Sequence, residues 1–176
     1  MTIQRLEEFA LSSPQHTAIQ ELLRLCFSEY PQQRSYYKQI PDFRYLVWQD
    51  QQLIGHLAVE HRMINVAGNI ARIFGVADLC VATSFQDQKI ASNLLQQLEN
   101  LGRQNDIDFL VLTAAEHKLY LNNGFQLVNN TCRWLMINEH QTLGVGHRRI
   151  EDCLMVKRLG PLQWKEGLVD LLGYVF

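Results

Sequence analysis

The stretch of residues 79–95 constrains the fold of this chain more than any other. It reads as a buried apolar strand, a short polar loop and the start of an amphipathic helix. Such a junction directs backbone N–H groups and the positive end of a helix dipole at one point, which suits a diphosphate. Small residues such as Ala91 let the backbone come close, whereas Lys89 fits only with its side chain pointing outward. An ordinary strand-to-helix loop capped by Ser84 is the alternative reading.

Length and charge narrow the function classes. A chain of 176 residues is long enough to bury a core and fits a single domain, 1–176. The formal net charge of −2, without a long basic run, argues against nucleic-acid binding. No apolar run approaches the roughly 20 residues of a membrane span. Glu7 and Glu8 near the N-terminus do not fit a signal peptide.

The cysteines are scattered and favour free thiols. Cys26, Cys80, Cys132 and Cys153 form no CxxC pair, and three of them lie in apolar segments. Buried reduced thiols and a cytoplasmic location are therefore expected, and a zinc site is not. The histidines show no metal-ligand spacing either, so we predict no metal.

Hydrophobic periodicity predicts a mixed α/β chain. The predicted strands are residues 2–11, 43–49, 53–66, 70–81, 107–113, 125–137 and 150–156. The predicted helices are residues 14–27, 88–104 and 116–122, the first with Ser13 as its cap and Pro14 at its first position. The segment 107–113 is almost wholly apolar, which indicates a strand buried on both faces.

Two motifs resemble the GCN5-related N-acetyltransferase (GNAT) superfamily. The apolar strand, Gln86, Ile90-Ala91 and the following leucine pair resemble its acyl-CoA loop, although Lys89 stands where that pattern has its first glycine. Downstream, Tyr120 lies four residues before Gly124-Phe125, another feature of that superfamily. One helix and one buried strand separate the two motifs, and together they are more specific than either alone.

The resemblance implies a GNAT fold, a central mixed, largely antiparallel sheet that is flanked by helices and splays to admit acyl-CoA. Acetyl-CoA, or another acyl-CoA, is the implied co-substrate. The main chain of Leu79, Cys80 and Val81 would pair with the pantetheine arm. Tyr120 would protonate the departing thiolate. The implied pyrophosphate loop consists of Gln86, Asp87, Gln88, Lys89, Ile90 and Ala91.

A narrower likeness points to one branch. The residues from His56 through Arg62 to Arg72 align without gaps with aminoglycoside 2′-N-acetyltransferases, and His56 and Arg62 are also similar to nodulation N-acyltransferases. Those aminoglycoside enzymes also carry a basic residue at the position of Lys89. The residues 149–156, followed by Trp164, resemble the end of both families.

The general base and the acceptor-binding residues are less specific. Asp78 is the candidate base, although strand alternation with Leu79 would let it face the wrong side of the sheet. Glu60 and His61 are alternatives. Glu151 and Asp152 match acidic tail residues of the aminoglycoside enzymes and are the candidates for binding a cationic acceptor. A cluster of Tyr30, Tyr36 and Tyr37 either stacks on a sugar or covers the core.

The expected function is transfer of an acetyl group from acetyl-CoA to a primary amine of a small molecule. An amino sugar or aminoglycoside is the first expectation, and a polyamine or peptide amine the second. Two alternatives remain: transfer of a longer acyl chain, and a GNAT-fold module that binds CoA without catalysis. GNAT relatives often dimerise, so a homodimer is open to this chain. Residues 164–176 would either supply its interface or fold back onto their own sheet.

Overall fold

The computed structural model describes residues 1–176 and contains two compact units. The first unit comprises Met1–Glu60 and Val76–Leu95, and the second comprises His61–Gly75 and Gln96–Phe176. Strands β3 (Gln52–Val66) and β4 (Asn69–Val81) and helix α2 (Ile90–Gln104) each contribute to both. No helix is both long and apolar enough to cross a membrane.

The first unit is built on an antiparallel meander. Strand β1 (Thr2–Glu7) pairs with β2 (Phe43–Gln49), which pairs with β3. The β2–β3 hairpin closes through Asp50 and Gln51, whose φ angles of 48° and 67° are those of a two-residue primed turn. These strands lie close to their predicted positions. The first strand was predicted too long, because a 3-10 turn, η1 (Glu8–Ala10), ends it.

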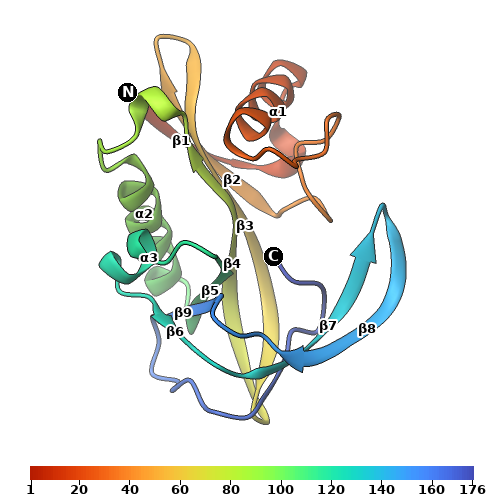
Figure 1. Cartoon of the computed structure of the whole chain (residues 1–176). Coiled ribbons are helices and arrows are strands. Elements are labelled where there is room, and N and C mark those ends of the chain that lie inside the picture. Colours follow the sequence, from red (N-terminus) through yellow and green to blue (C-terminus); the bar gives the residue numbers. More distant parts are fainter. The chain divides into compact units, whose positions relative to one another are not determined.

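Helix α1 (Ser13–Cys26) covers the core of the first unit (Figure 1). Its cap is Ser12 rather than the predicted Ser13, because the side chain of Gln15 accepts from the Ser12 N–H at 2.8 Å in a capping box. The predicted apolar stripe is confirmed. Its buried residues pack in one cluster that includes Ile19, Leu22, Leu23, Tyr30, Leu46, Leu53, Cys80 and Ala82.

The second unit holds the longest run of paired strands, in the order β6-β9-β5-β4-β3-β10-β7-β8. Strand β5 runs parallel to β4, and β10 parallel to β7, whereas the other registered pairs are antiparallel. The mixed, largely antiparallel sheet of the prediction is therefore confirmed. The further elements are β5 (Phe109–Thr113), α3 (Lys118–Asn122), β6 (Gln126–Leu127), β7 (Thr131–Asn138), β8 (Gln141–Arg149), β9 (Leu154–Arg158) and β10 (Leu168–Asp170).

The predicted single strand 125–137 is wrong, because it is broken into β6 and β7. The chain changes its partner strand here, because the N–H of Val128 donates to Leu154 of β9 whereas the carbonyl of Asn130 accepts from Ile150, just after β8. Asn130 also ties this point to a distant segment: its side-chain amide donates to the carbonyls of Lys165 and Gly167 and accepts from Trp164. The predicted strand 150–156 begins later, at Leu154.

Two strands were missed. Strand β8 is rich in glycine and polar residues, which hide its alternation, and it forms a curved hairpin with β7 (Figure 1). Gly146 is needed there because a side chain at this position would collide with the ring of Trp134, its partner across the hairpin. Strand β10 is only three residues long and pairs with β3 and β7.

The core of the second unit surrounds β5, whose residues from Phe109 to Leu112 are all buried. This confirms the prediction of a strand covered on both faces. Residues 164–176 fold back onto the second unit, as one of the two expectations had it, because β10 joins the sheet and Val175 and Phe176 pack against this core.

Candidate functional site

Asp78 lies inside β4, directly before Leu79, Cys80 and Val81. Its φ of 49° lies in the left-handed region. A non-glycine residue keeps that conformation only where its surroundings hold it. A left-handed residue inside a strand also breaks the regular alternation of side chains between the two faces. The argument that Asp78 faces the wrong side because it alternates with Leu79 therefore does not apply.

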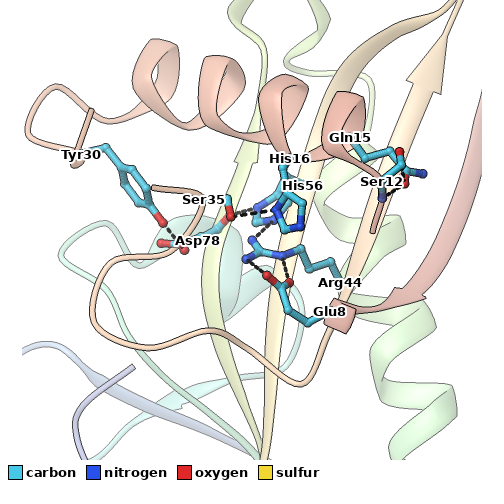
Figure 2. A network of polar contacts seen from close by, with 9 residues as sticks. All are labelled: Glu8, Ser12, Gln15, His16, Tyr30, Ser35, Arg44, His56 and Asp78. Atoms are coloured by element: carbon cyan, nitrogen blue, oxygen red, sulfur yellow. Dashed lines mark hydrogen bonds and ion pairs between the residues drawn. The ribbon is translucent and has the colours of Figure 1, made fainter. Parts of the chain in front are cut away.

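Figure 2 shows a chain of polar side chains that leads to Asp78. Arg44 donates to the two carboxylate oxygens of Glu8 through Nε and Nη2, at 2.5 and 3.3 Å. Its Nη1 lies 2.9 Å from Nε2 of His56, and Nδ1 of His56 lies 2.8 Å from the carbonyl oxygen of Asp78. Arginine has only donors, so Nε2 accepts and the neutral imidazole carries its proton on Nδ1. That proton is donated to the Asp78 carbonyl.

The carboxylate of Asp78 has its own partner. The phenol of Tyr30 donates to Oδ2 at 2.7 Å. Burial, reinforced by the charge of Asp78, raises the pKa of Tyr30, so the phenol keeps its proton and remains a donor. Burial also raises the pKa of Asp78, and the Tyr30 hydrogen bond and the charges of Arg44 and Lys38 oppose this rise. A carboxylate of raised pKa is a stronger base than an ordinary aspartate.

His56 makes the stability of the fold depend on pH. Burial, helped by the charge of Arg44, lowers its pKa to about 3. The unfolded chain, with a histidine pKa of about 6.5, then binds a proton that the folded protein does not. The contribution of neutral His56 to stability is complete at pH values above the unfolded-chain pKa of about 6.5, and it falls as the pH drops toward the folded-state pKa of about 3.

We therefore expect the free energy of unfolding to fall by about 2 kcal/mol as the pH drops from about 7 to about 5, because His56 is protonated only in the unfolded chain. Urea denaturation at each pH measures it. The His56→Gln variant has no group that titrates at this position. Its unfolding free energy should therefore fall by about 2 kcal/mol less than that of the wild type over the same pH range. Equal pH dependence in the two proteins would contradict the assignment of a neutral buried imidazole.

The polar loop after β4 contains two further left-handed residues. A 3-10 turn, η2 (Thr83–Phe85), leads into it, and the side-chain amide of Gln86 donates to the carbonyl of Val81 at 3.3 Å. Asp87 and Lys89 both have φ of 61°. Helix α2 begins at Ile90, later than predicted, so Ser84 is not its cap.

The backbone of Lys89 has a conformation that favours glycine. This explains why the acyl-CoA loop pattern of the GNAT superfamily has a glycine at this position. Its backbone carbonyl accepts from the N–H of Asn93 at 2.9 Å, as a residue just before a helix does. Ile90 is buried, whereas Lys89 is exposed. The lysine side chain is thus on the surface, next to the N–H groups of the first turn of α2.

Tyr120 lies in the second unit, in the short helix α3. It is half-buried, and its ring meets that of Phe125 edge to face, with centroids 5.7 Å apart. Its carbonyl accepts from the N–H groups of Asn123 and Phe125, both at 3.0 Å. Gly124, with φ of 81°, makes the left-handed stop that the sequence predicts. The two motif positions, Tyr120 and Gly124-Phe125, are therefore parts of one local structure.

Glu151 and Asp152 are exposed between β8 and β9. The carbonyl of Asp152 lies 2.8 Å from Nε2 of His117, the residue that precedes α3, so this turn is tied to the start of the Tyr120 helix. A separate hollow of about 810 Å³ in the second unit contains none of the predicted site residues. Its lining includes Asn130 and Trp164, and the indole N–H of Trp164 donates a hydrogen bond to the side-chain oxygen of Asn130.

Within the second unit, β4 pairs in parallel with β5 from Ile73 and Phe109 to Gly75 and Val111. A side chain at Gly75 would collide with the ring of Phe176. The guanidinium of Arg62 lies 4.3 Å from that ring and 4.6 Å from the ring of Tyr174, whose carbonyl it also binds at 2.9 Å. Arg62 thus anchors the folded-back segment.

Sequence reasoning overlooked the partners of Asp78. A signal was present, because Arg44 stands within the apolar run of a predicted strand, where a charge requires a buried partner. Nothing in the sequence names Glu8 as that partner. The tyrosine cluster divides: Tyr30 is 7% exposed and belongs to the core, whereas Tyr37 is 52% exposed.

A family model described as an acetyltransferase (GNAT) domain matches residues 10–128. The chain belongs to the GNAT acetyltransferase family. The predicted superfamily and fold are confirmed, and this GNAT protein is an acyl-CoA-dependent acyltransferase. The narrower likeness to aminoglycoside 2′-N-acetyltransferases stays a prediction. Among curated proteins, no sequence matches significantly.

Solved structures support the GNAT fold. The family N-acetyltransferase YhbS from Escherichia coli, in complex with CoA, has a TM-score of 0.65 at 20% identity, covering 96% of this chain and 88% of that one. Escherichia coli ElaA has a TM-score of 0.62 at 16% identity, covering 90% and 100%. Eis1 from Mycobacterium abscessus has 0.61 at 14% identity, and the match covers 76% of this chain but only 33% of Eis1.

Proposed function

We propose that the protein transfers an acetyl group from acetyl-CoA to a primary amine of a small molecule, with an amino sugar or aminoglycoside as the first candidate. The observation that carries this proposal is the Asp78 carboxylate, which is held by Tyr30 immediately before Leu79. An amine acceptor is protonated near neutral pH and must lose a proton before it attacks, so an N-acetyltransferase needs a base of this kind.

In the proposed reaction, Asp78 takes a proton from the acceptor ammonium. The neutral amine then attacks the thioester carbonyl carbon. The carbon–sulfur bond breaks, and Tyr120 gives its proton to the departing thiolate. The proton that the attacking nitrogen then loses restores the Tyr120 phenol, which yields an amide and free CoA. The raised pKa of Asp78 supports its role as a base. The role of Tyr120 rests on the family resemblance and on its place in the Tyr120 to Phe125 turn.

For acetyl-CoA, we propose that the main chain of Leu79, Cys80 and Val81 binds the pantetheine arm as an added strand. The N–H groups of residues 86–91 would hold the pyrophosphate at the start of α2. The left-handed backbone at Lys89 supports this, because it presents the conformation of a glycine at that position. Glu151 and Asp152 are exposed acids, and we assign them to a cationic acceptor.

Calorimetric titration with acetyl-CoA, followed by an assay of free CoA with a panel of amines, tests this proposal. We expect binding, and CoA release that depends on an amino sugar or aminoglycoside. Release only with a long-chain acyl-CoA would indicate the acyl-chain alternative. Binding without release for any amine would leave a CoA-binding module, and absence of binding would overturn the proposal.

Lys89→Gly separates the charge of this side chain from its backbone. Glycine keeps the left-handed φ, so the fold is retained, but the positive charge is lost. An exposed charge contributes about 1 kcal/mol at most, so the Kd for acetyl-CoA should rise about fivefold. Calorimetry at low salt measures this change. High salt should remove the difference, and Lys89→Arg should bind as the wild type does. A loss of all binding in Lys89→Gly would show that more than charge is involved.

A further inference from the structure

A strained residue needs a device that holds it. Asp78 adopts a left-handed φ in the interior of β4, directly before the three residues assigned to pantetheine. For a residue with a Cβ this conformation costs about 1 kcal/mol or more. It therefore persists only if neighbouring groups fix the peptide bonds on either side. The carbonyl that follows the strained φ accepts the hydrogen bond from Nδ1 of His56.

The donor of that hydrogen bond is itself immobilised. His56 and Arg44 are fully buried, and Glu8 is 9% exposed. Arg44 binds the carboxylate of Glu8 with two nitrogens and His56 with the third. Both ring nitrogens of His56 are thus occupied, which fixes its tautomer and the plane of its ring. Figure 2 shows that the three side chains form a continuous line to Asp78.

We propose that His56 is a positioning residue for acyl transfer. Because the Glu8–Arg44 pair holds His56 in place, His56 in turn holds the Asp78 carbonyl in place. By holding that carbonyl, His56 aims the Asp78 carboxylate at the acceptor and sets where the pantetheine-binding main chain begins. This role rests on the proposed function of Asp78. Tyr30 acts at the other end, because its phenol fixes the carboxylate oxygen.

The groups that face Asp78 come from four segments. They are Tyr30 and Lys38 from the stretch after α1, Arg44 from β2, His56 from β3 and Cys80 from β4. If the Asp78 peptide loses its hydrogen bond, the carboxylate leaves this set and becomes more exposed to water. Its pKa then moves down, toward that of an ordinary aspartate.

Two amide variants separate the two nitrogens of His56. Asparagine places an N–H near the position of Nδ1 and can still donate to Asp78, whereas glutamine reaches toward Arg44 and cannot. In His56→Gln we expect kcat/KM to fall by up to about 100-fold, because a small misplacement of the reacting groups has an effect of that size. The acidic limb of its pH profile should move to lower pH, and the Kd for acetyl-CoA should rise several-fold. His56→Asn should stay close to the wild type in all three measurements.

Hydrogen exchange without ligand separates this inference from the proposed function. The peptide covering residues 78–81 should exchange faster in His56→Gln than in the wild type or His56→Asn. This holds even if no amine is acetylated. His16→Gln is the matched control, because His16 contacts Ser35 at 3.3 Å and not Asp78. The inference is overturned if a folded His56→Gln shows wild-type exchange and pH profile, or if both His56 variants lose function equally.

Discussion

Tyr120→Phe should lower kcat by about 10²- to 10⁴-fold, the usual contribution of a general acid. The variant removes only the hydroxyl group. The edge-to-face contact with Phe125 and the backbone hydrogen bonds of the turn remain, so the fold of α3 should not change. Binding of acetyl-CoA precedes protonation of the thiolate, so its Kd should be unchanged. Steady-state release of CoA and calorimetric titration measure the two quantities separately.

Leu121→Ala is the matched control for that variant. Leu121 follows Tyr120 in α3 and is 50% exposed, so its truncation tests whether any change in this helix affects turnover. We expect nearly wild-type kcat. If Tyr120→Phe turns over at the wild-type rate, the acid is another group or water. If it loses acetyl-CoA binding, Tyr120 binds the co-substrate rather than donating a proton.

The elements that carry strong local periodicity were predictable. The strand 43–49 coincides with β2, and the apolar run around Phe109 identified a buried strand, because in both cases side-chain burial alone decides the structure. Strand β8 was not predictable in this way. Its Gly146 leaves room for the ring of Trp134, and that requirement arises only after the hairpin has formed.

In the candidate site, too, the features set by neighbouring residues were predictable and those set by distant residues were not. The loop and the Tyr120 motif are contiguous in sequence, so their spacing was sufficient to find them. The conformation of Asp78 depends on His56, 22 positions earlier, and through Arg44 on Glu8. Hydrogen bonds between residues so far apart leave no periodic signal. The left-handed φ of Asp78 and Lys89 could not be read from the residue types, because only a few per cent of non-glycine residues adopt it.

The Glu8–Arg44 ion pair should dominate the stability of the first unit. Glu8→Gln leaves the guanidinium of Arg44, which is fully buried, without the carboxylate that it binds directly. Breaking a buried pair by removing one partner costs about 3–5 kcal/mol of unfolding free energy, because the remaining charge is neither hydrated nor compensated. Urea denaturation at neutral pH, followed by circular dichroism, measures this loss.

Glu7→Gln provides the control, because Glu7 pairs with Arg5 at 2.9 Å but both side chains are at least 40% exposed. An exposed pair contributes about 0–1 kcal/mol, so neighbouring glutamates with similar bond lengths should differ several-fold in their effect. The double variant Glu8→Leu with Arg44→Met should lose less than the sum of the two single losses, since no buried charge is left alone. Equal effects of Glu7→Gln and Glu8→Gln would mean that water reaches Arg44. The chain from Glu8 to Asp78 would then lack the rigidity that holds a left-handed residue inside a strand.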